Sequence, residues 1–140
     1  MALLAKAYAQ QDPFQIWGDG KQTRNFTYVA DIVRALLLAS EHVDDATPVN
    51  AGIADYISID DVVESLFDQL DWRPESIEYL EDRPVGVRHR AADTTRARRL
   101  LSWEPEYTIE EGLAATVEWY TKTRDEDHLR ENLETLLHER

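Results

Sequence analysis

The sequence predicts a protein of the α/β class, and two features of its 140 residues support that class. Short apolar strands alternate along the chain with segments in which apolar residues recur at helical spacing. The length fits one domain, or a lobe of a larger one, and no internal repeat or low-complexity linker divides it. We therefore expect one α/β unit with a modest core.

The first elements are expected before residue 53. Residues 2–10 are predicted to be the end of a helix, and the apolar run FQIW, 14–17, is predicted to be a strand that enters a glycine turn. Asp31 is expected to open a helix whose broad apolar face packs against a sheet. Residues 47–52 are expected to form a strand that ends at Gly52.

Later helices are marked by residues that cap helix N-termini. A helix cap accepts hydrogen bonds from the first backbone amides, which have no partner inside the helix. A strand is predicted over residues 76–80, and a short helix is predicted to end near Leu101. The predicted caps and partners are Ser58 with Asp61, Asp93 alone, and Thr108 with Glu111.

The final segment, 123–140, is expected to be a charged amphipathic helical tail, separate from a main portion of residues 1–122. We expect this helix to dock on its own domain, and a homo-oligomer contact through the same face is the alternative. Its apolar side carries Leu129, Leu133, Leu136 and Leu137.

The charge of the chain narrows the range of partners. Twenty-eight acidic and 15 basic residues give a net charge of −13, which disfavours binding to nucleic acid. Only three of the basic residues are lysine and 12 are arginine. This composition fits either adaptation to high salt or an ordinary acidic protein.

Other function classes are excluded by what the sequence lacks. The chain has no cysteine, so disulfides, thiolate catalysis and cysteine-bound metals are ruled out. No apolar run approaches the roughly 20 residues of a membrane span, and the first residues do not resemble a signal peptide, so a cytoplasmic location is expected. The four histidines form no metal-spaced pair, and no G-x-S-x-G elbow, P-loop or dinucleotide fingerprint is present.

The arginines provide the strongest functional signal. Residues 82–99 hold six of the 12 arginines against two acids, a local charge of +4 in an acidic chain. The planar guanidinium fork matches phosphate oxygens two at a time, so this segment is a candidate site for a small phosphate ester. Three of these arginines are interpreted as surface residues of a helix that pair with nearby acids: Arg96, Arg98 and Arg99. For Arg88 and Arg90, which lie in a loop, both anion binding and pairing with nearby acids are kept as interpretations.

A second candidate lies near the N-terminus. Gly18 and Gly20 allow a tight turn and a close approach to a ligand, and Arg24 follows four residues later. Arg24 could therefore reach the same anion as the arginine patch. A plain surface turn is the alternative interpretation, because G-x-G alone is a weak signal.

Five stretches in this order resemble the C-terminal half of the extended short-chain dehydrogenases, the NAD-dependent nucleotide-sugar epimerases and dehydratases. The resemblance covers about residues 1–122. It implies an α/β substrate-binding lobe that lacks most of the Rossmann domain. The stretches are FQIWGDGKQTRNFTYVADIVRAL, PVNAG, ISIDDVVE, RPVGVRHRAADTTRARRLLSWEPEYTIEEGL and VEWY.

The resemblance also implies roles for particular residues. The strand 14–17 would lie along the nucleotide base, largely through its backbone, and Asp93 would lie near the ribose or cap the next helix. Arg24 would bind the diphosphate from one side, and Arg88 or Arg90 from the other. The substrate-binding set implied in this way is Phe14, Gln15, Trp17, Arg24, Arg88, Arg90 and Asp93.

Catalysis is not expected from this chain alone. The family uses a Tyr-x-x-x-Lys pair as its general base, and none of the six tyrosines is followed by lysine at that spacing. NAD(P) would bind the N-terminal Rossmann half, and no cofactor is expected here.

Two hypotheses are therefore carried forward. In the first, the chain is the nucleotide-sugar-binding portion of an epimerase or dehydratase, either as a truncated reading frame or as one part of a split enzyme whose partner would be a separate Rossmann-half polypeptide. In the second, it is a non-enzymatic binding or interaction module that keeps the fold. An RNA-binding role through the arginine patch is disfavoured by the net charge, and no membrane partner is expected.

Overall fold

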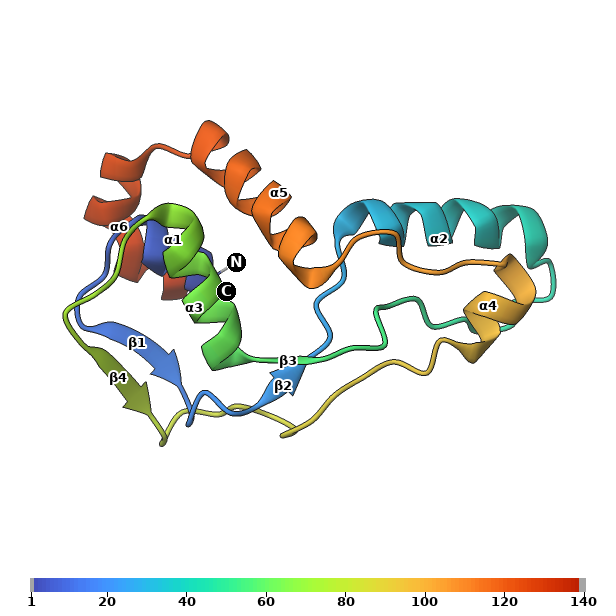
Figure 1. The fold of residues 1–140 in the computed structure, drawn as a ribbon, viewed down its shortest axis with the longest axis horizontal. Coiled ribbons are helices and arrows are strands. Elements are labelled where there is room, and N and C mark those ends of the chain that lie inside the picture. Colours follow the sequence, from blue (N-terminus) through green and yellow to red (C-terminus); the bar gives the residue numbers. More distant parts are fainter. Residues whose placement is uncertain (1, 139–140) are drawn as a thin grey trace.

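The computed structural model describes residues 2–138, except for the side chains of residues 134 and 136–138. In this range the chain forms helices at both ends and short strands between them (Figure 1). In order, the elements are α1 (Ala2–Tyr8), β1 (Phe14–Trp17), β2 (Thr23–Arg24), α2 (Val29–His42), β3 (Ile57–Ser58), α3 (Ile59–Leu70), β4 (Ile77–Leu80), α4 (Thr95–Leu101), α5 (Ile109–Thr123) and α6 (Glu126–His138).

The strands form two small pairs. β1 and β4 are parallel, with Phe14 opposite Ile77 and Trp17 opposite Leu80. β2 and β3 are antiparallel, with Thr23 opposite Ser58. A single parallel bridge between Thr23 and His89 adds the segment after β4 to the second pair. These pairings bring three distant parts of the sequence together around β2.

The main core lies where β1 meets helices α1, α3, α5 and α6, on one side of the elongated molecule (Figure 1). Phe14 is completely buried and contacts Phe67 edge-to-face, with ring centroids 4.9 Å apart. A second, smaller cluster joins α2 to α4 at the opposite end, around the buried Trp103. The candidate site described below lies in the loops between these clusters.

Most predicted elements are confirmed. The helix near the N-terminus, the strands at 14–17 and 77–80, and both capped helices form where the sequence placed them. The Ser58 side chain accepts a hydrogen bond from the Asp61 amide, and Thr108 and Glu111 form a complete capping box.

Two predictions about caps are corrected. Helix α2 begins at Val29 with Tyr28 as its N-cap, so Asp31 does not open it. Asp31 is buried instead, because its carboxylate accepts hydrogen bonds from other segments. Helix α4 has Thr94 as its N-cap rather than Asp93, although the Asp93 carboxylate still accepts a hydrogen bond of 3.0 Å from the Thr95 amide.

The predicted strand at 47–52 does not form in the described chain. A strand is defined by the hydrogen bonds that it makes to a neighbour, and no described strand lies beside this segment. The apolar face of α2 is likewise uncovered by a sheet. Its side chains of Val29, Val33, Leu36 and Leu37 are 48–65% exposed.

The C-terminal helix α6 packs on α1, as expected for a docked amphipathic helix. Leu129 and Leu133 are buried in the main core, and the Arg130 side chain donates a hydrogen bond to the Ala9 carbonyl oxygen. The side chains of Leu136 and Leu137, which the sequence assigned to the same face, lie outside the described residues. The boundary between residues 122 and 123 stays a prediction.

Candidate functional site

The candidate site is a cavity of about 490 Å³ between three irregular segments. One segment follows β2, the second precedes Ile53, and the third lies between β4 and α4. Two arginines, two asparagines and a threonine supply its polar groups. The lining residues are Arg24, Asn25, Phe26, Thr27, Asn50, Ala51, Arg90, Ala91 and Ala92.

Side-chain hydrogen bonds hold these three segments against one another. The Asn25 amide donates to the Ile53 carbonyl at 3.3 Å, and the Thr27 hydroxyl accepts from the Ile53 amide at 3.0 Å. The Asn50 side chain donates to the Asp93 carbonyl at 3.3 Å. The buried Gly52 keeps this junction tight, because an added Cβ would lie 3.2 Å from the Asn25 amide nitrogen.

Arg24 is fixed by backbone carbonyl groups. Its guanidinium donates hydrogen bonds of 2.7 Å to the carbonyl oxygens of Thr23 and Val85. Among the residues that the structure describes, neither Arg24 nor Arg90 forms an ion pair with a carboxylate. Both arginines therefore keep an uncompensated positive charge at one cavity, which suits an anion.

Arg88 lies in the same loop but has a carboxylate partner. Its guanidinium is 3.4 Å from the Asp19 carboxylate, and its side chain is 63% exposed. Asp19 stands at the tip of the turn between β1 and β2, where Gly18 and Gly20 have φ angles of +80° and +71°. The predicted glycine turn therefore exists, and it meets the arginine loop through this ion pair.

The turn is seated on the first turn of α3. The Asp60 amide donates a hydrogen bond of 3.0 Å to the Gly20 carbonyl, and the Tyr79 hydroxyl donates one of 3.2 Å to the Asp60 carboxylate. Burial raises the pKa of Asp60 above its usual value, although the hydrogen bond from Tyr79 acts in the opposite direction. Burial and the neighbouring Asp60 charge also raise the pKa of Tyr79.

The residues predicted on β1 have separate environments. Phe14 is 0% exposed, and its amide donates a hydrogen bond of 2.9 Å to the Ser76 carbonyl oxygen. The backbone role expected for this strand at the nucleotide base stays a prediction. The Gln15 side chain donates to Glu78 at 2.9 Å. Trp17 is half exposed at the end of the strand, and the Arg83 guanidinium lies 5.8 Å from its ring centroid.

The structure thus brings Arg24 and Arg90 to one cavity, places Arg88 beside it, and leaves Gln15 and Trp17 at the end of β1. Asn25, Phe26 and Thr27 line the cavity and were not predicted as site residues. Their position directly after Arg24, in a stretch without helical or strand period, is the signal that could have identified them.

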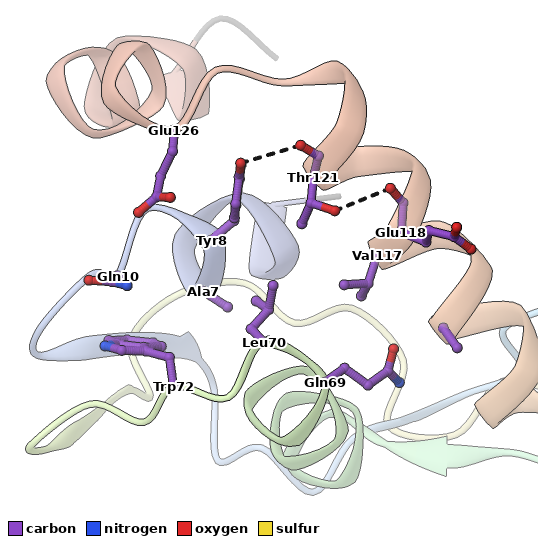
Figure 2. Close-up of a pocket in the computed structure, with 11 residues that line it drawn as sticks. Ala7, Tyr8, Gln10, Gln69, Leu70, Trp72, Val117, Glu118, Thr121 and Glu126 are labelled. Atoms are coloured by element: carbon purple, nitrogen blue, oxygen red, sulfur yellow. Dashed lines mark hydrogen bonds between the residues drawn. The ribbon is translucent and has the colours of Figure 1, made fainter.

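A second cavity of about 490 Å³ lies between α1, α3, α5 and the start of α6 (Figure 2). Its carboxylates are already paired, since Glu118 contacts Lys122 at 2.5 Å and Glu126 contacts Arg130 at 2.5 Å. No arginine of the described chain lines it. This cavity therefore does not offer the free positive charge that an anion requires.

Within the described residues, no group of histidine and carboxylate side chains is arranged to hold a metal ion. In the same part of the chain, no helix has the length and apolar character needed to cross a membrane.

The chain is thus an α/β lobe in which a glycine turn lies beside a loop that brings two arginines to one cavity. A family model described as GDP-mannose 4,6 dehydratase matches residues 1–116. The chain belongs to this family of extended short-chain dehydrogenases, the nucleotide-sugar epimerases and dehydratases, and corresponds to a C-terminal portion of them.

Curated relatives agree with this assignment. A UDP-glucuronate 4-epimerase of Thermodesulfobacterium geofontis is 37% identical over 110 residues, which cover 79% of this chain and 34% of that protein. A dTDP-glucose 4,6-dehydratase of Xanthomonas campestris is 35% identical over 127 residues, which cover 84% of this chain and 36% of that protein. The chain therefore spans about a third of the length of these relatives.

Solved structures show the same correspondence. The UDP-glucose 4-epimerase of Thermotoga maritima, solved with UDP-glucose, has a TM-score of 0.78 and 33% identity, over 86% of this chain and 38% of that chain. The dTDP-glucose 4,6-dehydratase of Bacillus anthracis, solved with NAD, has a TM-score of 0.78 and 26% identity, over 91% of this chain and 40% of that one.

Proposed function

We propose that this chain is the nucleotide-sugar-binding portion of an NAD-dependent epimerase or dehydratase, and that its arginine cavity binds the diphosphate of the substrate. The observation that carries the proposal is that Arg24 and Arg90, from segments far apart in the sequence, lie at one cavity and have no carboxylate partner among the described residues. Two guanidinium groups match the paired phosphates of a nucleoside diphosphate through charge-assisted hydrogen bonds.

The geometry favours Arg90 over Arg88 as the partner of Arg24. Arg90 lines the cavity, whereas Arg88 faces Asp19, whose negative charge offsets its own. Arg88 would then contribute through the glycine turn, which it holds through that ion pair. Binding energy at the diphosphate would orient the sugar toward a reactive centre supplied elsewhere.

The residues of this chain do not fit NAD. In a dinucleotide site the glycine-rich turn runs from a strand into a helix, whose N-terminus faces the pyrophosphate. The turn Gly18–Gly20 runs from β1 into β2 instead. We therefore assign NAD, and the Tyr-x-x-x-Lys base, to a Rossmann portion outside this chain, either in the same protein or in a separate polypeptide.

The test is calorimetric titration of the 140-residue chain with UDP-glucose, GDP-mannose and dTDP-glucose. The proposal expects micromolar to millimolar binding of at least one nucleotide sugar, and weaker binding as salt is raised, because the contact is ionic. No binding of any of the three by a folded sample would contradict it. That result would favour the alternative, a non-enzymatic binding or interaction module that keeps the fold.

A further inference from the structure

We propose that His89, through a side-chain hydrogen bond to Thr23, is a positioning residue that sets Arg90 opposite Arg24; this inference rests on the proposed function. The His89 Nδ1 atom lies 3.0 Å from the Thr23 hydroxyl oxygen. Thr23 immediately precedes Arg24, and His89 immediately precedes Arg90. One side-chain contact therefore links the two residues next to the cavity arginines.

The backbone around this contact shows why a second attachment matters. The segment after β4 has no helix or strand from residue 81 to 88. Within the described chain its backbone joins that of β2 at one bridge, in which the Thr23 amide donates to the Arg88 carbonyl at 2.9 Å. This backbone hydrogen bond ends at Arg88, two residues before Arg90, and so does not by itself fix the position of Arg90. The bond from the Thr23 hydroxyl to His89 adds a second point of attachment one residue further on.

The three consecutive residues at this bridge have different partners. Arg88 pairs with Asp19 of the glycine turn, Arg90 lines the cavity, and His89 between them bonds to β2. Arg24 holds the same loop three residues before Arg88, through the Val85 carbonyl. The loop is thus attached to β2 at Val85, at Arg88 and at His89, and the His89 bond is the attachment nearest to Arg90.

The energetic consequence concerns preorganisation. Arg90 is exposed, so its position before binding depends on the backbone that carries it. An anion that binds between Arg24 and a mobile Arg90 must also order the loop, which lowers the affinity. Because one hydrogen bond contributes modestly to stability, loss of the His89 bond is expected to weaken binding about 2- to 10-fold.

The experiment compares His89→Ala, Thr23→Val and the double variant by titration with the nucleotide sugar that the wild-type chain binds best. Each single variant should bind about 2- to 10-fold more weakly, and the double variant no more weakly than the worse single one, because both remove the same bond. His89→Asn, whose side-chain amide can occupy the Nδ1 position, should restore most of the affinity. His42→Ala, an exposed histidine at the end of α2, is the matched control and should leave the affinity unchanged.

A measurement without ligand keeps the inference testable if a variant binds poorly for another reason. Backbone ¹⁵N order parameters of residues 88–90 should fall in His89→Ala and recover in His89→Asn. Wild-type affinity and unchanged order parameters in His89→Ala would overturn the positioning role while the proposed function stands. Failure of the wild-type chain to bind any of the three nucleotide sugars would overturn both.

Discussion

The guanidinium group of Arg24 donates a hydrogen bond of 2.7 Å to the carbonyl oxygen of Val85, a residue 61 positions further along the chain. A carbonyl group orients the guanidinium and leaves its positive charge in place. A carboxylate would orient it and also neutralise that charge. Arg24 is therefore held in place and still able to attract an anion. This contact also holds the loop that carries the second cavity arginine. The Arg24 side chain therefore supplies a positive charge to the cavity and positions the loop beside it.

Asp31 should be important for stability rather than for binding. Its side chain is 1% exposed and accepts hydrogen bonds from the amides of Glu106 and Tyr107 at 2.9 and 3.2 Å, and from Arg34 at 3.0 Å. Asp31→Ala leaves these donors without their acceptor, so the free energy of unfolding should fall by about 2–4 kcal/mol. Urea denaturation followed by circular dichroism measures this loss. Asp44→Ala, at an exposed loop position, is the control and should change stability by less than about 0.5 kcal/mol.

The same carboxylate should give the protein an acid-sensitive component of stability. Burial acts to raise the pKa of Asp31, but the hydrogen bonds from Glu106, Arg34 and Tyr107 outweigh it and lower the pKa below its usual value. A group whose pKa is lower in the folded state stabilises the fold above its unfolded pKa of about 3.9 and loses that contribution as the pH falls through the folded value. The stability difference between wild type and Asp31→Ala should therefore shrink from pH 6 to pH 2.5. A difference that stays constant over this range would contradict the assignment.

Two glycines with nearly equal φ angles should respond differently to alanine. Gly20 and Gly86 have φ angles of +71° and +70°, so both substitutions carry a backbone cost of about 1 kcal/mol. A Cβ at Gly20 would also lie 1.8 Å from the Asp60 carboxylate, whereas at Gly86 the nearest atom is 3.9 Å away. Asp60 would have to turn aside and lose its bond from Tyr79. Gly20→Ala should therefore destabilise the chain by about 1 kcal/mol more than Gly86→Ala in thermal melts. The additional destabilisation of Gly20→Ala over Gly86→Ala should disappear in an Asp60→Ala background. If it persists there, the clash is not with Asp60 and the explanation is contradicted.

The apolar face of α2 should make the isolated chain prone to bind hydrophobic dyes or to self-associate. Leu36 and Leu37 are 65% and 61% exposed, and apolar surface of this kind normally has a partner. The 140-residue chain should bind a hydrophobic dye or self-associate, and replacing both leucines by serine should reduce this. Tyr56→Ser removes an equally exposed side chain, 61%, from a different surface and should have a smaller effect. A dye-silent wild-type monomer in light scattering would contradict the expectation.

The sequence predicted local structure well because the relevant signals are local. Ser58 and Thr108 cap their helices through contacts within three residues, so the capping pattern contains the information. Asp31 was misassigned for the opposite reason. The two backbone amides that bond to it, from Glu106 and Tyr107, lie 75 and 76 residues away, so the nearby sequence does not distinguish a buried acceptor from a helix cap.

The candidate site was predictable in part. Residue type and loop context identified Arg24, Arg88 and Arg90 as candidates for anion binding, but only the fold separates Arg90 at the cavity from Arg88 beside Asp19. The predicted strand at 47–52 depends on a neighbour that the described chain does not provide. Pairing between distant segments is therefore the information that composition and periodicity could not supply.

The central claim is that two arginines from distant loops bind one diphosphate. Its most direct test is the dissociation constant for the preferred nucleotide sugar in wild type, Arg24→Ala, Arg90→Ala and the matched surface control Arg99→Ala. The account predicts that Arg24→Ala and Arg90→Ala each weaken binding by about 10-fold or more, since each removes a charge-assisted contact, while Arg99→Ala leaves it unchanged. Equal affinities in all four proteins would contradict it.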